Sequence, residues 1–118
     1  MEAIKLFDSE LKIMGIIWEN EPVSAKEISL FAADATGWNK NTTYTIIKKL
    51  IEKKAVERTE PNYVCRSCVK KEDVQKAETQ NLIDRLYSGS KKAFFTAFVE
   101  ENISDEEFAE LKKMLKKR

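Results

Sequence analysis

The order of helix start and stop signals in the first half of the chain constrains its fold more than any other feature. Asp8 is a good N-cap, and apolar residues recur at helical spacing after it. They predict a first helix at about 9–20, which ends before Pro22. Ser24 and Glu27 then have the spacing of a capping box, in which each side chain satisfies a backbone N–H at the start of a helix. The chain is therefore expected to begin with two short helices.

A third helix is predicted after a short break. Gly37 ends the second helix, and Asn39 is placed to cap a helix at about 40–53. The inward positions of the second helix are predicted to be Ile28, Phe31, Ala32 and Ala35. The apolar stripe of the third helix consists of Ile46, Ile47, Leu50 and Ile51. In a chain of 118 residues, these stripes are expected to share one core.

The pattern changes from helix to strand after Lys54. Residues 55–59 and 63–69 resemble two short strands, and the Glu-Pro-Asn sequence at 60–62 forms the turn between them. Three helices followed by a hairpin are typical of a winged helix-turn-helix with a two-stranded wing. We therefore expect a mainly α protein with a winged helix over residues 1–71.

The remaining residues, 72–118, are predicted to form a helical dimerisation segment. A helix at about 72–87 is broken at 88–90, and Ser104 and Glu107 form a second capping box before the last helix. This segment is too thin to bury its large apolar residues alone. A dimer core explains them more economically than a small-molecule pocket does. The residues expected at the dimer interface are Leu82, Leu86, Phe94, Phe95, Phe98, Phe108 and Leu111.

Positive charge is concentrated in the middle of the chain. Residues 1–37 hold three Lys against seven Asp or Glu and carry −4, whereas 38–71 hold nine Lys or Arg against three Glu and carry +6. Residues 72–118 carry −1. A local basic surface of this kind is the electrostatic footprint of phosphate binding.

The outer face of the third helix is the candidate DNA-binding surface. It carries side chains that suit base edges in a major groove, namely Asn41, Thr42, Tyr44 and Thr45. The residues expected to contact phosphates are Lys48, Lys49 and Lys53, with Arg58 and Arg66 on the wing. The alternative interpretation is an ordinary solvated helix face. The order of elements and the basic block favour DNA.

One pair of cysteines is the candidate site for metal binding or redox chemistry. Cys65 and Cys68 have C-x-x-C spacing, but two ligands are too few for zinc, and the chain has no His. Residues three apart in a strand also point to opposite faces. We therefore interpret both as structural cysteines and expect neither a metal nor another cofactor.

The absence of His also removes the commonest general base, so the chain is not expected to be an enzyme. No apolar run has the length of a membrane span, and the first residues lack the layout of a signal peptide. The protein is expected to be cytoplasmic.

Several groups of residues together resemble the BlaI/MecI/CopY family of bacterial repressors. They are Asp8-Ser9-Glu10-Leu11, Ile16-Ile17-Trp18, Trp38-Asn39 before Thr42, Leu50 and Lys53, and Tyr87-Ser88-Gly89-Ser90. The resemblance runs from about residue 6 to 117. It implies a homodimer that binds an inverted repeat in double-stranded DNA through its winged helix and represses genes for β-lactam resistance or copper handling.

The chain departs from the family pattern in three places. The usual Trp-Ser-Pro-Lys-Thr entry to the recognition helix reads Trp38-Asn39-Lys40-Asn41-Thr42 here, so the operator sequence cannot be carried over. No cysteine follows Cys68, which opposes copper sensing by a C-terminal cysteine cluster. Proteolysis inactivates members of the β-lactam branch before a Phe that matches Phe98, but the usual Asn is Ala97 here, so a protease partner is left open.

Three hypotheses remain from the sequence. The first is a dimeric repressor that recognises a palindromic operator through its third helix. The second is a redox or metal sensor in which Cys65 and Cys68 control DNA affinity. The third is a protein-interaction module that uses a winged helix with little affinity for DNA.

Overall fold

The computed structural model describes residues 4–117 and contains two compact units, which divide between Gln75 and Lys76. The sequence predicts a domain boundary after residue 71; α4 (Lys71–Leu86) begins at that point, and the two compact units meet within it. Across residues 4–117, no helix combines the length and the apolar character that crossing a membrane requires.

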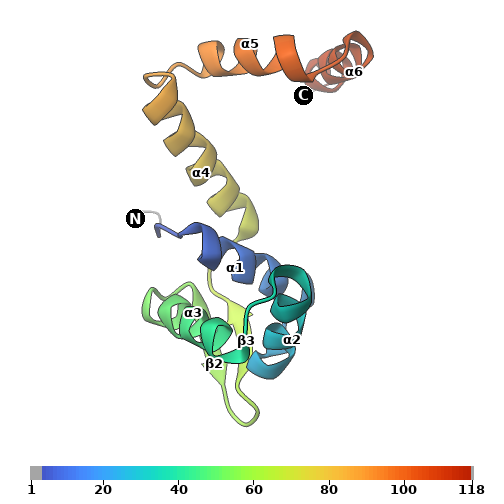
Figure 1. Ribbon diagram of the computed structural model, residues 1–118. Coiled ribbons are helices and arrows are strands. Elements are labelled where there is room, and N and C mark those ends of the chain that lie inside the picture. Colours follow the sequence, from blue (N-terminus) through green and yellow to red (C-terminus); the bar gives the residue numbers. More distant parts are fainter. Residues whose placement is uncertain (1–3, 118) are drawn as a thin grey trace. The chain divides into compact units, whose positions relative to one another are not determined.

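The first unit is a winged helix, as the sequence predicted (Figure 1). Its helices are α1 (Asp8–Asn20), α2 (Ala25–Thr36) and α3 (Lys40–Glu52). Its strands are β1 (Val23–Ser24), β2 (Val56–Thr59) and β3 (Val64–Ser67), which form an antiparallel sheet in the order β1-β3-β2. The hairpin of β2 and β3 is the wing.

The sequence did not predict β1. Val23 pairs with Cys65 and Ser24 with Val64 in the sheet, and Ser24 is also the N-cap of α2. A strand of two residues shows no alternation, so it leaves no periodic signal in the sequence. Pairing with β1 covers the edge of β3 that faces away from β2.

The core of the first unit lies between the three helices and the sheet. Its largest fully buried apolar side chains are Ile13, Met14, Ile17, Ile28, Ile47 and Leu50, and Cys65 of β3 is also fully buried. These residues come from all three helices and the central strand. The helical spacing predicted for α1 and α3 therefore corresponds to one shared core.

The prediction for the inward face of α2 was partly wrong. Ile28 and Ala32 are buried, but Phe31 is 45% exposed and Ala35 is exposed. The other buried residues of α2 are Ala25 and Ser29. Both Phe31 and Ser29 lie within one helical turn of Ile28, so the sequence spacing alone allows either residue to share the buried face with Ile28. Tertiary packing buries the face of α2 that carries Ser29 and leaves Phe31 partly in solvent.

The start of α1 also differs from the prediction. Asp8 is the first residue of the helix, and Phe7 is the N-cap. The Phe7 side chain cannot accept a hydrogen bond, but its backbone N–H donates to Glu10 Oε1 at 2.8 Å. Asp8 instead places a negative charge in the first turn, where it complements the helix dipole.

The second unit consists of the rest of α4 with α5 (Lys91–Asn102) and α6 (Asp105–Lys116). Ile83 is its buried residue among those that the structure describes. Tyr87 and Phe94 pack edge to face at 5.4 Å between ring centroids. Gly89, at φ +81°, lies in the turn that follows α4. The capping box of Ser104 and Glu107 begins α6, as predicted.

Candidate nucleic-acid interface

The start of α3 is fixed by a side-chain cap. Asn39 Oδ1 accepts a hydrogen bond from the backbone N–H of Thr42 at 2.8 Å. Gly37, at φ +78°, ends α2 two residues earlier, because this left-handed conformation favours a residue without a Cβ. Asn39 thus supplies the cap, and Lys40 takes the first helical position.

The predicted contact residues of α3 lie on its solvent side. Asn41, Thr42, Thr45, Lys48 and Lys49 are exposed. Tyr44 is half-buried, and the opposite side of the helix, with Thr43, Ile46, Ile47 and Leu50, packs into the core. The exposed side therefore combines amide, hydroxyl and methyl groups with two positive charges.

A hollow of about 470 Å³ lies between this side of α3 and the wing. Its lining residues are Lys40, Asn41, Tyr44, Thr45, Lys48, Arg58 and Tyr63. Arg58 comes from β2, and Tyr63 from the end of the turn between the strands. Sequence analysis missed Lys40 and Tyr63, although both lie in the basic middle block. The hollow gathers three cationic side chains from two separate elements.

Aromatic and cation–π contacts hold the two sides of this hollow together. The rings of Tyr44 and Tyr63 pack edge to face at 5.8 Å between centroids. The Arg58 guanidinium lies over the Tyr63 ring at 3.7 Å, and Lys40 Nζ lies 5.4 Å from the Tyr44 ring centroid. A hydrogen bond from Arg58 to Glu60 raises the pKa of Arg58, against the opposing effect of desolvation. The wing is thus packed directly against α3.

A second hollow, of about 530 Å³, lies along the neighbouring side of α3. Its lining residues are Ser9, Trp38, Asn39, Asn41, Thr42, Thr45, Ile46 and Lys49. Asn41 and Thr45 line both hollows, so they form the ridge between them. The predicted base-reading residues therefore lie on or beside one ridge of α3.

The two wing arginines lie on opposite faces of the hairpin. In the sheet Arg58 lies opposite Cys65, and the Cys65 side chain is buried. Arg66 lies opposite Glu57, one position further along the hairpin. Successive residues of a strand alternate between faces. Arg66 Nη1 donates to Thr59 Oγ1 at 3.5 Å. Arg58 therefore joins the hollow beside α3, and Arg66 does not.

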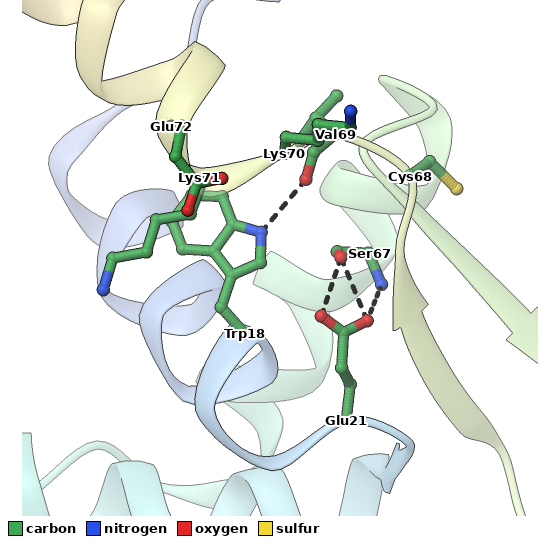
Figure 2. Close-up of a pocket in the computed structure, with 8 residues that line it drawn as sticks. All are labelled: Trp18, Glu21, Ser67, Cys68, Val69, Lys70, Lys71 and Glu72. Atoms are coloured by element: carbon green, nitrogen blue, oxygen red, sulfur yellow. Dashed lines mark hydrogen bonds between the residues drawn. The ribbon is translucent and has the colours of Figure 1, made fainter.

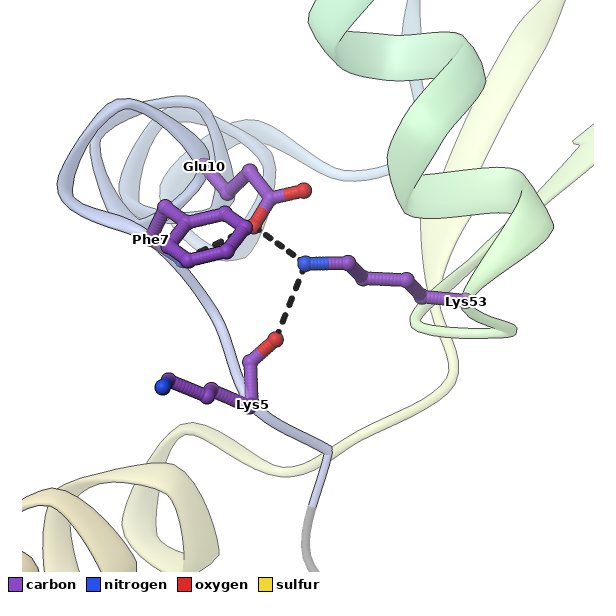
Figure 3. A network of polar contacts seen from close by, with 4 residues as sticks. All are labelled: Lys5, Phe7, Glu10 and Lys53. Carbon is purple, nitrogen blue, oxygen red and sulfur yellow. Dashed lines mark hydrogen bonds and ion pairs between the residues drawn. The ribbon is translucent and has the colours of Figure 1, made fainter.

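Lys53, which the sequence predicts to contact phosphates, takes part in a polar network at the end of α3 (Figure 3). Its Nζ lies 2.6 Å from Glu10 Oε1 and donates to the Lys5 carbonyl at 2.9 Å. It also lies 4.4 Å from the centroid of the Phe7 ring. Burial of Glu10 opposes its ionisation, but the hydrogen bonds from Lys53 and Phe7 outweigh this effect and lower the pKa of Glu10.

Hydrogen bonds from Trp18 and to Glu21 hold residues 67–69, where the wing ends (Figure 2). The indole N–H of Trp18 donates to the Val69 carbonyl at 3.1 Å. The Ser67 backbone N–H donates to Glu21 Oε1 at 2.8 Å. The Ser67 hydroxyl donates to Glu21 Oε2 at 2.9 Å. These contacts join the C-terminal end of α1 to the residues that precede α4.

Cys65 and Cys68 lie in different environments. Cys65 is buried in the core, and Cys68 is exposed just after β3, with its sulfur pointing away from Trp18 and Glu21 (Figure 2). Burial raises the pKa of the Cys65 thiol to about 11. Burial and the charges of Glu57 and Glu21 also raise the pKa of Cys68. Both thiols are therefore held in the protonated, poorly nucleophilic form.

The residues predicted for dimerisation lie in the second unit and differ in exposure. Leu86 is 71% exposed, and Phe95, Phe98 and Phe108 are between 38% and 48% exposed. The half-buried members are Leu82, Phe94 and Leu111. Phe94 stacks with Phe98 at 6.1 Å between ring centroids.

Comparison with known proteins places this architecture in a family. The model of the penicillinase repressor family matches residues 6–117. The methicillin resistance regulatory protein MecI of Staphylococcus aureus (strain N315) is 28% identical over 120 aligned positions, which cover 99% of this chain and 98% of MecI. The penicillinase repressor of Bacillus licheniformis is 24% identical over 114 positions, which cover 94% of this chain and 89% of that repressor.

Solved structures show the same fold. The DNA-binding domain of the repressor BlaI matches with a TM-score of 0.56 and 24% identity, over 62% of this chain and 93% of that domain. A monomeric form of BlaI from Bacillus licheniformis, solved in complex with the blaP half-operator, matches equally well. The match of the family model confirms the resemblance to BlaI/MecI repressors and the expectation of a protein that is not an enzyme. The chain is a transcriptional repressor that belongs to the penicillinase repressor family.

Proposed function

We propose that this repressor binds an inverted-repeat operator as a homodimer and places α3 of each subunit in the major groove. The exposed side of α3, flanked by a wing that brings Arg58 beside it, carries this proposal. Support also comes from the BlaI relative, which was solved in complex with a half-operator. A repressor that works in this way acts on chromosomal DNA, so we expect it in the cytoplasm.

The exposed side of α3 supplies two kinds of contact. Asn41, Thr42, Tyr44 and Thr45 carry the donors, acceptors and methyl groups that distinguish base pairs in the major groove. The residues proposed to neutralise phosphates are Lys48, Lys49, Arg58 and Arg66. The Thr45 hydroxyl donates to the Asn41 carbonyl at 2.9 Å, so its methyl group and oxygen lone pairs are what it can offer to a base.

The second unit is proposed to hold the dimer together. Leu86, Phe95, Phe98 and Phe108 expose large apolar surfaces in a unit with one buried apolar residue among those described. Association of two copies would remove these surfaces from water. Two winged helices on one dimer would also match the two halves of an inverted repeat.

Proteolytic inactivation is not part of the proposal. Ala97, which replaces the usual Asn, lies inside α5 together with Phe98. Cleavage there would require the helix to open first.

Selection from a random-sequence duplex library tests the proposed function. Duplexes recovered with the full-length chain should share an inverted repeat whose half-sites are centred one helical turn apart, about 10 base pairs, or a multiple of that. A variant with Thr42→Ala and Thr45→Ala should recover a weaker consensus from the same library. Recovery of unrelated sequences by the unaltered chain would contradict specific DNA recognition by α3.

A further inference from the structure

We propose that Glu60 acts as an anionic stand-in for a DNA backbone phosphate, holding Arg58 beside α3 until a phosphate replaces it. This role of Glu60 rests on the proposed binding of DNA. It assigns a phosphate-binding position to the hollow between α3 and the wing, and it gives Glu60 control over the strength of DNA binding.

The contact between Arg58 and Glu60 has the form of a guanidinium–oxyanion pair. Arg58 Nε donates to Glu60 Oε2 at 2.9 Å, and Nη2 of the same guanidinium lies 2.8 Å from that oxygen. A phosphate oxygen accepts from the same fork of N–H groups. The carboxylate therefore occupies the place of a phosphate at this guanidinium.

The Arg58 side chain is already positioned for the exchange. Its guanidinium lies over the Tyr63 ring, which packs against Tyr44 of α3. Lys40 and Lys48 line the same hollow. Among residues 4–117, Arg58 pairs with Glu60, and neither Lys40 nor Lys48 has an acidic side chain within ion-pair distance. An incoming phosphate would thus meet three positive charges and one competing negative charge.

The pair is exposed enough to be exchanged. The side chains of Arg58 and Glu60 are 44% and 57% exposed, so water and ions reach both. Exposed ion pairs of this kind are weak, whereas duplex DNA offers a dense array of phosphates. The Lys53–Glu10 pair differs, because Glu10 is 2% exposed and its partner makes a second hydrogen bond. Water and ions therefore reach the Arg58–Glu60 pair more readily than the Lys53–Glu10 pair.

The test compares two substitutions that remove the same charge from the wing. Glu60→Gln weakens the pair with Arg58, and Glu57→Gln, on the other face of β2, leaves that pair intact. Full-length variants are titrated with a random-sequence duplex of about 25 base pairs, followed by fluorescence anisotropy at several salt concentrations. We expect Glu60→Gln to tighten binding about threefold more than Glu57→Gln does. Thermal unfolding checks that both variants are folded.

A double-mutant cycle locates the effect on Arg58. In an Arg58→Gln background, Glu60→Gln should tighten binding no more than Glu57→Gln does, because no guanidinium remains to be released. Equal effects of the two substitutions in both backgrounds would overturn the proposal and leave only a general charge effect. Weaker binding by Glu60→Gln would also overturn it, since Glu60 would then orient Arg58 for DNA.

The outcome separates this role from the proposed function itself. If the unaltered chain shows no salt-dependent binding to any duplex, DNA recognition fails and the role of Glu60 fails with it. If the unaltered chain binds but Glu60→Gln matches Glu57→Gln, only the role of Glu60 fails.

Discussion

The carboxylate of Glu10 at the start of α1 and the ammonium of Lys53 at the end of α3 lie 2.6 Å apart. They are 43 residues apart in the sequence, and each belongs to a motif that carries the family resemblance. The pair closes the first unit by joining its first and third helices, and Lys53 also places a positive charge at the C-terminal end of α3. Two motifs that are separate in the sequence therefore form one ion pair between α1 and the end of α3.

Removing Lys53 should destabilise the first unit. Lys53→Met keeps the length of the side chain but leaves the buried Glu10 carboxylate without its ionic partner, which we expect to cost on the order of 2 kcal/mol in the free energy of unfolding. Urea unfolding measures this loss. Lys48→Met, at an exposed position of α3, is the matched control and should change stability little. For binding to random DNA we expect the opposite order, with Lys48→Met weakening binding more than Lys53→Met does. A larger DNA-binding defect for Lys53→Met in fully folded protein would restore Lys53 as a phosphate contact.

Stability should depend on the ionisation of Glu10. Its pKa is lowered in the folded protein from the ordinary value of 4.5, so the unfolded chain takes up the proton first as the pH falls. The stabilisation by ionised Glu10 is complete above the unfolded value and is lost as the pH falls through the folded value. The difference in free energy of unfolding between the unaltered chain and Glu10→Gln should therefore be largest near pH 7 and shrink below pH 4.5. A difference that stays constant down to pH 3 would show that the carboxylate is not the stabilising form.

Substitutions on α3 should separate sequence preference from general affinity. Thr42→Ala or Tyr44→Phe should weaken operator binding by about 1–3 kcal/mol and random-DNA binding much less. Tyr44→Phe retains the ring that packs against Tyr63, so its effect reports the hydroxyl group. Lys48→Ala should weaken binding to any duplex and flatten the salt dependence by about one unit of slope. If the double variant at Thr42 and Tyr44 keeps the ratio of operator to random affinity, α3 is not the reading helix.

Charges placed on the exposed aromatic residues of α5 should separate the dimer. Phe95→Glu with Phe98→Glu would put two carboxylates into the proposed interface, so we expect a monomer at micromolar concentration by sedimentation. Leu30→Glu is the control, because Leu30 of α2 is 63% exposed and belongs to the first unit. That variant should remain dimeric. A dimer that survives both changes in α5 would place the interface elsewhere.

The two cysteines should respond differently to substitution. Cys68→Ser, at an exposed position, should alter neither stability nor DNA binding, with or without reductant. Cys65→Ser puts a hydroxyl into the core and should lower the free energy of unfolding by about 1–3 kcal/mol. Cys65→Ala separates this polarity effect from the loss of volume. A large change of DNA affinity in folded Cys68→Ser would instead favour the redox-sensor hypothesis.

The sequence by itself determined the helices of the first unit, because their signals are local. Ser24, Gly37 and Asn39 act within a few residues of themselves, so capping and turn chemistry could be recognised without knowing the fold. The exposed side of α3 followed from its periodicity for the same reason. The hairpin was also visible, since its strands are continuous.

Only the tertiary structure decided which residues meet across the chain. The ion pair of Lys53 with Glu10 joins two distant segments, and Lys40 and Tyr63 line one hollow only because the wing folds against α3. The placement of Arg58 and Arg66 on opposite faces depended on the register of the hairpin. Such contacts are set by packing between distant segments, and no local pattern in the sequence records them.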